Sequence, residues 1–137
     1  MGSFEVFEHT ADAGVIAEGR TLPEVFVEAA KGMYSLMVSL PTVRPDLRRE
    51  VDAEGNDLEH LLTNWLLELL MLTETEGLVF SEFHVSIADG KLHGVAGGES
   101  LDEARHDPQA VVKGVTRHLL SVEPADGGYR ARVIFDL

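Results

Sequence analysis

The chain has 137 residues, of which 45% are hydrophobic and 26% are charged, a balance typical of one globular domain with its own core. Lysine and arginine number 11 against 24 aspartate and glutamate residues, so the formal net charge of −13 disfavours binding to a nucleic-acid backbone. This acidity suits a basic protein partner, or it serves solubility alone. The absence of cysteine excludes disulfides and cysteine-based zinc sites, and no segment resembles a signal peptide or membrane span, so we expect a cytoplasmic protein.

Two helices are the clearest elements that the sequence predicts. Thr21 and Glu24 form a capping box, and apolar residues recur behind them at helical spacing until Pro41 and Pro45 end the pattern. The second helix begins with Asn56 as its expected cap. Its apolar face is so broad that this helix must pack against a sheet.

Strands are expected on both sides of these helices. Apolar and polar residues alternate after Gly77, and Asp89-Gly90 is a type I′ turn signal that returns the chain along this strand. A glycine-rich, charged loop is expected at 97–108. The expected strands are residues 4–7, 15–18, 47–52 (near an edge), 78–87, 91–96, 110–122 and 129–136. This order predicts a single α+β domain over residues 1–137, with two layers in which a mixed or antiparallel sheet packs against two main helices.

Three oxygen donors lie near the two ends of the chain. Asp12 falls in a short polar connector after the first strand, Asp136 is the penultimate residue, and Leu137 carries an α-carboxylate. If the fold brings these groups together, they form a hard-donor set suited to Ca²⁺ or Mg²⁺. Two plainer interpretations stay open: Asp12 accepts hydrogen bonds from its own backbone in an Asx-turn, or the last two residues are frayed.

Other candidate sites are weaker. His84 and His93 could face each other across the predicted hairpin, where a polar cross-strand pair is favoured over an incomplete zinc site. His9 would lie beside a metal at Asp12 or bond only to the backbone. Lys113 is expected to face outward, with contact to a phosphate or to an acidic group of a partner as the alternative. Neither a nucleophile motif nor a phosphate-binding loop occurs, so no catalytic residue is expected.

Several motifs occur in the order that is characteristic of one known family. They are Phe7-Glu8-His9-Thr10-Ala11-Asp12 with Gly14, Gly19-Arg20-Thr21-Leu22, Leu61-Leu62, Trp65-Leu66, Glu68-Leu69-Leu70, Gly98-Glu99, Asp102, His106, Val112-Lys113, Val115-Thr116, His118 and Val133-Ile134-Phe135-Asp136-Leu137. On this pattern, which spans nearly the whole chain, the sequence resembles the archease family. Arg105 and Arg117 depart from the family pattern, which has lysine and an aromatic residue there.

The resemblance implies an accessory protein of an RtcB-type RNA-splicing ligase, without enzyme activity of its own. Such a protein promotes guanylylation and multiple turnover of the ligase in tRNA splicing or RNA repair. The resemblance also implies a divalent cation, Ca²⁺ first and Mg²⁺ or Mn²⁺ otherwise, at Asp12, Asp136 and Leu137. The ligase is then the expected partner, and neither direct nucleic-acid binding nor a membrane is expected. A small metal-dependent hydrolase and an acidic chaperone-like interaction module are the alternatives.

Overall fold

A computed structural model describes residues 2–8 and 12–137 of the chain. The elements, in chain order, are β1 (Ser3–Glu8), β2 (Asp12–Gly19), α1 (Leu22–Met37), the 3₁₀ helix η1 (Leu40–Thr42), β3 (Leu47–Glu54), α2 (Leu58–Glu76), β4 (Leu78–Ala88), β5 (Lys91–Ser100), α3 (Glu103–His106), β6 (Gly114–Ala125) and β7 (Gly128–Asp136).

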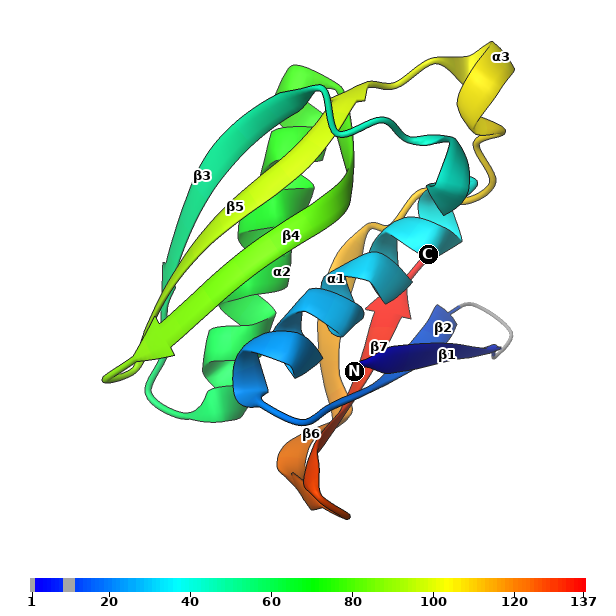
Figure 1. Ribbon diagram of the computed structural model, residues 1–137. Coiled ribbons are helices and arrows are strands. Elements are labelled where there is room, and N and C mark those ends of the chain that lie inside the picture. Colours follow the sequence, from blue (N-terminus) through cyan, green and yellow to red (C-terminus); the bar gives the residue numbers. More distant parts are fainter. Residues whose placement is uncertain (1, 9–11) are drawn as a thin grey trace.

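The strands divide between two antiparallel sheets. One sheet has the strand order β1-β2-β7-β6, and the other has the order β3-β5-β4. Helix α1 contacts β2 and β4, and α2 contacts β3 and β6, so each helix packs against both sheets (Figure 1). The predicted α+β class is confirmed, with the two main helices packed on sheet as expected. The strands, however, form two sheets where the sequence led us to expect one.

The core is organised around two buried aromatic residues that also tie the helices together. The indole N–H of Trp65, which is completely buried, donates to the carbonyl oxygen of Phe26 over 3.0 Å. The hydroxyl of Tyr34 donates to the carbonyl oxygen of Leu69 over 3.1 Å and lies 2.7 Å from the hydroxyl of Thr73. Burial raises the pKa of Tyr34 well above its usual range, so its phenol stays neutral. Both rings therefore enter the core with their polar atoms satisfied.

The local signals at α1 and at the β4–β5 hairpin are confirmed. The hydroxyl of Thr21 accepts a hydrogen bond from the backbone N–H of Glu24 over 3.3 Å, and α1 ends at Met37, before the first of the two prolines. Asp89 and Gly90 have φ values of 52° and 73°, as a type I′ turn requires. Strand β3 lies at a sheet edge, also as predicted. Across the part of the chain that the structure describes, no helix combines the length and the apolar character needed to cross a membrane.

The cap of α2 differs from the prediction by one residue. The side chain of Asp57, rather than that of Asn56, accepts a hydrogen bond from the backbone N–H of His60 over 2.8 Å. The backbone N–H of Asn56 donates to the Nδ1 atom of His60 over 3.1 Å. Both residue types are good caps, so the sequence alone did not separate them.

Replacing Asp57 by alanine should lower the free energy of unfolding by about 1 kcal/mol, because the first turn of α2 loses its acceptor and a favourable negative charge. Asn56→Ala is the matched control and should change this free energy by less than about 0.5 kcal/mol. Urea denaturation of both variants measures the difference. Equal losses of unfolding free energy in the two variants would contradict the assignment of the cap to Asp57.

Two strand boundaries in the C-terminal half were predicted wrongly. Strand β5 continues to Ser100 and includes a glycine pair that the sequence placed in a loop. A Cβ atom on Gly98 would lie 1.9 Å from the carbonyl oxygen of Val79, so glycine here lets β4 and β5 approach closely. Strand β6 begins only at Gly114, because residues 101–113 form a connection that contains α3.

Candidate metal centre

Asp12 and Asp136 lie directly opposite each other on neighbouring strands. Strand β2 runs antiparallel to β7, and their register pairs Asp12, the first residue of β2, with Asp136, the last residue of β7. Directly opposite residues of an antiparallel pair project from the same face of the sheet, with Cβ atoms about 5 Å apart. The two carboxylates are therefore neighbours. Asp12 belongs to a strand and not to the connector, and Asp136 is still within β7 rather than in a frayed end.

One carboxylate oxygen of Asp12 is buried and has no hydrogen-bond partner among the residues that the structure describes. Its Oδ1 atom is inaccessible to solvent and accepts no hydrogen bond within residues 2–8 and 12–137. An unsatisfied buried carboxylate oxygen is costly, and a bound cation would supply the missing interaction. The hydroxyl of Thr116 is buried and unpartnered in the same way. Thr116 follows Gly114, the β6 residue that pairs with Asp136, by two positions, so it lies on the same face of the sheet.

The ring of Phe7 covers the backbone next to Asp12. Gly14 is the next residue on the same face of β2, and it pairs with Phe7 across the β1–β2 ladder. A Cβ atom on Gly14 would lie 2.1 Å from the Cζ atom of Phe7, so the ring rests directly on the glycine. An apolar cover lowers the local dielectric constant, and this strengthens attraction between a carboxylate and a cation. Nothing in the periodicity of the sequence indicated this role for Phe7 and Gly14.

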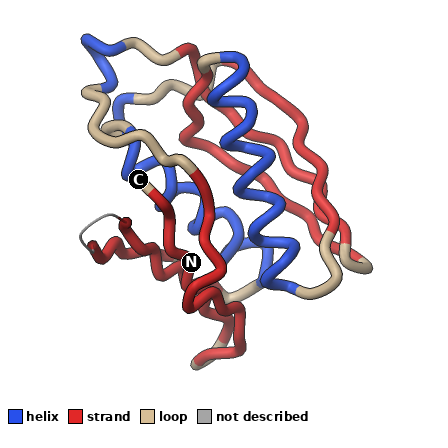
Figure 2. Tube along the Cα trace, turned by 180° about the vertical axis from the view of Figure 1, so that it is seen from behind, coloured by secondary structure: helices blue, strands red, loops and turns tan. Residues whose placement is uncertain are grey.

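Lys113 is anchored beside the same strand end. Its backbone N–H donates to the carbonyl oxygen of Asp136 over 2.7 Å. The residue is exposed, as expected, but it precedes β6 instead of lying within a strand. Figure 2 shows the connection that carries Lys113 passing beside the C-terminus. The main chain of Lys113 is thus fixed beside the last residue of β7.

The donor set fits a hard divalent cation. Asp12 and Asp136 supply side-chain carboxylates, and Leu137, which follows β7, would add its α-carboxylate. Ca²⁺ takes six to eight oxygen ligands, so water or a partner's oxygen would complete the shell. Within the described residues, no group of three His, Cys, Asp or Glu side chains gathers to hold a metal ion. The candidate centre contains two such side chains and depends on the main-chain carboxylate for its third donor.

The sequence and the fold were compared with known proteins. The model of the Archease protein family matches residues 4–137. This chain belongs to the archease family. Protein archease of Thermococcus kodakarensis is 42% identical to it, and that of Sulfurisphaera tokodaii is 39% identical, each with all of both chains aligned.

Solved structures agree with this membership. The solution structure of Methanobacterium thermoautotrophicum protein 1598 superposes with a TM-score of 0.84 at 41% identity, covering 98% of each chain. The crystal structure of a Thermotoga maritima archease, described as a possible chaperone, has a TM-score of 0.65 and covers 96% of this chain and 94% of that one. At 18% identity it supports the fold alone.

The predicted pair of histidines on the β4–β5 hairpin of this archease is wrong. His93 lies opposite Ser86 in the register, so it is offset from His84 along the hairpin. The Nδ1 atom of His93 lies 2.8 Å from a carboxylate oxygen of Asp52 on β3. The remaining candidate, His9, lies outside the described residues.

A partly buried polar cluster fixes the connection that leads to Lys113. The completely buried His106 has its Nε2 atom 3.0 Å from Glu99, and its Nδ1 atom accepts from the backbone N–H of Asp102 over 2.9 Å. Because Nδ1 is the acceptor, Nε2 carries the proton that is donated to Glu99. The guanidinium of Arg105, 2.6 Å away, and the backbone N–H of Arg44 hold the pKa of Glu99 well below its usual range. In the sequence this cluster was visible only as family motif residues.

As the pH falls below about 4.5, the free energy of unfolding should decrease less steeply in Glu99→Gln than in the parent. The pKa of Glu99 is lower in the folded state than its ordinary value of 4.5, so its stabilising effect is complete above that pH and is lost as the pH falls further. The variant should be less stable than the parent at neutral pH and should lose less on acidification. Urea denaturation between neutral pH and about pH 3 measures both slopes, with the exposed Glu123→Gln as control. Parallel losses in the parent and Glu99→Gln would contradict this assignment.

Proposed function

We propose that this chain is a non-catalytic activator of an RtcB-type RNA-splicing ligase, acting in the cytoplasm with a divalent cation held at Asp12, Asp136 and Leu137. It promotes guanylylation and multiple turnover of the ligase in tRNA splicing or RNA repair. The pairing of Asp12 with Asp136 at the end of β7 is the observation that carries this proposal. Ca²⁺ is the preferred ion, and Mg²⁺ and Mn²⁺ are alternatives, because oxygen-only sites accept all three.

The charge of the chain favours action through a protein rather than on RNA. A net charge of −13 repels a phosphate backbone at long range, whereas a basic patch on a partner would be attracted. The chain therefore acts on the ligase, and the ligase alone contacts RNA.

The test is a guanylylation and ligation assay with the cognate RtcB-type ligase in excess over this protein. The parent should raise both the GMP–ligase adduct and the amount of sealed RNA beyond one turnover per ligase. Asp12→Ala and Asp136→Ala should remove this stimulation while circular dichroism shows them folded, and Glu123→Ala, an exposed carboxylate on β6, should stimulate like the parent. Stimulation by both aspartate variants would show that the metal assignment is wrong. No stimulation by the parent would show that the activator role is wrong.

The parent and the same variants also distinguish the two alternative functions, a hydrolase and a chaperone-like module. A metal-dependent hydrolase would turn over phosphoesters without the ligase. A chaperone-like module would bind unrelated unfolded chains without any dependence on Asp12. Its surface could not be the apolar face of α2, because that face is buried in the core.

A further inference from the structure

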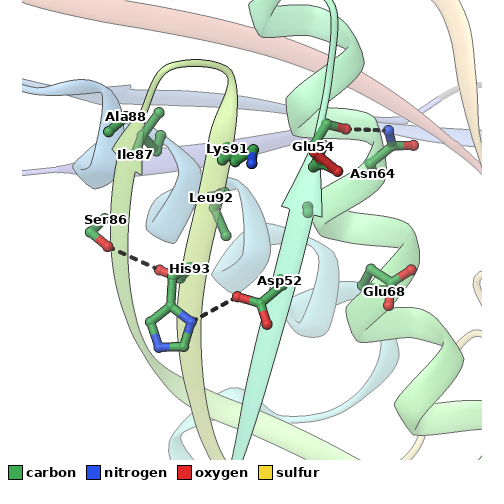
Figure 3. A pocket seen from close by; sticks show the side chains of 11 residues that line it. Asp52, Glu54, Asn64, Glu68, Ser86, Ile87, Ala88, Lys91, Leu92 and His93 are labelled. Atoms are coloured by element: carbon green, nitrogen blue, oxygen red, sulfur yellow. Dashed lines mark hydrogen bonds and ion pairs between the residues drawn. The ribbon is translucent and has the colours of Figure 1, made fainter.

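A groove lies at the far side of the fold from the candidate metal centre, beside the edge strand β3. Its volume is about 760 Å³, and it is bordered by β3, by the β4–β5 hairpin and by α2 (Figure 3). Its apolar lining residues are Ala53, Ile87, Ala88 and Leu92, its acidic ones are Asp52, Glu54 and Glu68, and Lys91 and His93 also line it. The candidate metal centre is built on the other sheet.

Two of the three acidic residues of this groove, Glu54 and Glu68, are not neutralised by the protein itself, whereas Asp52 is paired with His93 at 2.8 Å. Glu54 and Glu68 make no side-chain hydrogen bond or ion pair within the described parts of the chain. Lys91 lies opposite Glu54 in the register but forms no ion pair with it there. Several arginines are already engaged by other carboxylates, in the pairs Arg130–Glu18 (3.0 Å), Arg49–Glu76 (3.1 Å) and Arg105–Glu99 (2.6 Å). The groove therefore keeps free negative charge.

The walls of the groove are held in place before any ligand arrives. The side-chain amide of Asn64 on α2 donates to the backbone carbonyl of Glu54 over 2.7 Å, which ties the helix to the edge of β3. The Nδ1 atom of His93 lies 2.8 Å from Asp52 and orients its carboxylate (Figure 3). A site whose walls are already ordered loses less conformational entropy on binding.

We infer that this groove docks a basic protein segment in which an apolar side chain is flanked by lysine or arginine. The apolar side chain would cover the partly exposed Ile87, and the flanking cations would reach Glu54 and Glu68. The net charge of −13 steers such a segment toward the protein, and the apolar lining rewards burial of its central side chain. This inference goes beyond the proposed function, because it requires neither the cation nor the ligase.

The test is an NMR titration of the ¹⁵N-labelled full chain with a short synthetic peptide in which leucine alternates with arginine. Amide signals of β3 and the β4–β5 hairpin around Glu54 and Lys91 should shift, whereas a peptide with glutamate in place of arginine should cause no shift. The double variant Glu54→Gln/Glu68→Gln should bind the arginine peptide about fivefold more weakly, as expected for two exposed ion pairs.

The control is Glu123→Gln/Asp126→Asn, which makes the same change in net charge at exposed positions of β6 and its turn. It should bind like the parent, and so should Asp12→Ala, which separates this groove from the candidate metal centre. Equal weakening by the two double variants, or shifts centred elsewhere, would overturn the inference. So would spermine shifting the same amides as strongly as the peptide, because spermine offers charge without an apolar side chain.

Discussion

Calcium should raise the melting temperature of the parent chain and leave that of Asp12→Asn almost unchanged. A ligand at one hundred times its dissociation constant stabilises the folded state by about 2.7 kcal/mol. For a domain of this size, that free energy corresponds to a rise of roughly 10 °C. Asp12→Asn removes one of the charged donors, and Asp136→Asn removes its cross-strand neighbour, so each should lose most of the rise.

Without a cation, the order of stability should reverse. Like charges directly opposite on an antiparallel pair destabilise the sheet, and the unpartnered oxygen of Asp12 adds a desolvation cost. Asparagine at position 12 removes the charge. In the presence of a chelator, Asp12→Asn should therefore be more stable than the parent by roughly 0.5 kcal/mol.

Differential scanning calorimetry with EDTA and with each of Ca²⁺, Mg²⁺ and Mn²⁺ measures both effects. Asp126→Asn, in the exposed β6–β7 turn, is the matched control and should respond like the parent. A parent that melts at one temperature under all four conditions would contradict the cation site. If calcium raises the melting temperature of Asp12→Asn as much as that of the parent, Asp12 is not a ligand of the cation.

Gly98→Ala should lower the free energy of unfolding by about 3 kcal/mol or more. The new Cβ atom would lie 1.9 Å from the carbonyl oxygen of Val79 and 2.8 Å from the Cα atom of Phe80. Both are backbone atoms of β4, so no side-chain rotation relieves the contact. The two strands must separate next to the irregularity between Phe80 and Glu82, and hydrogen bonds of the ladder would be lost.

Gly114→Ala is the matched control for this substitution. An added Cβ atom at Gly114 meets nothing within 4 Å, and its φ is not among the positive glycine values. The variant should change stability little, or raise it by about 0.5 kcal/mol through the unfolded state. Urea denaturation measures both variants, and similar losses at the two glycines would refute the close approach of β4 and β5.

Signals that act over a few residues were predictable from the sequence. Thr21 and Glu24 meet within one turn of α1, and the Asp89-Gly90 turn depends only on its own backbone angles. Neither the helix cap nor the turn depends on residues far away in the sequence. The choice between Asn56 and Asp57 failed because two adjacent acceptors offer nearly the same local free energy.

The pattern of apolar residues did not predict which strands pair with each other. Alternation of apolar residues tells which face of a strand is buried, but it says nothing about which strand lies beside it. The division into two sheets was therefore not foreseen. For the same reason Gly98 suggested a loop, since its role depends on the backbone of β4, a separate stretch of the chain.

For the candidate metal centre, the proposed donors came from the sequence by itself. Oxygen chemistry and the family motifs singled out Asp12, Asp136 and Leu137 before any fold was known. Only the tertiary structure set Asp12 opposite Asp136, buried one oxygen of Asp12, and laid the ring of Phe7 over Gly14. These features come from the registers of β1, β2 and β7, which are chosen by packing of the whole core rather than by neighbours along the chain.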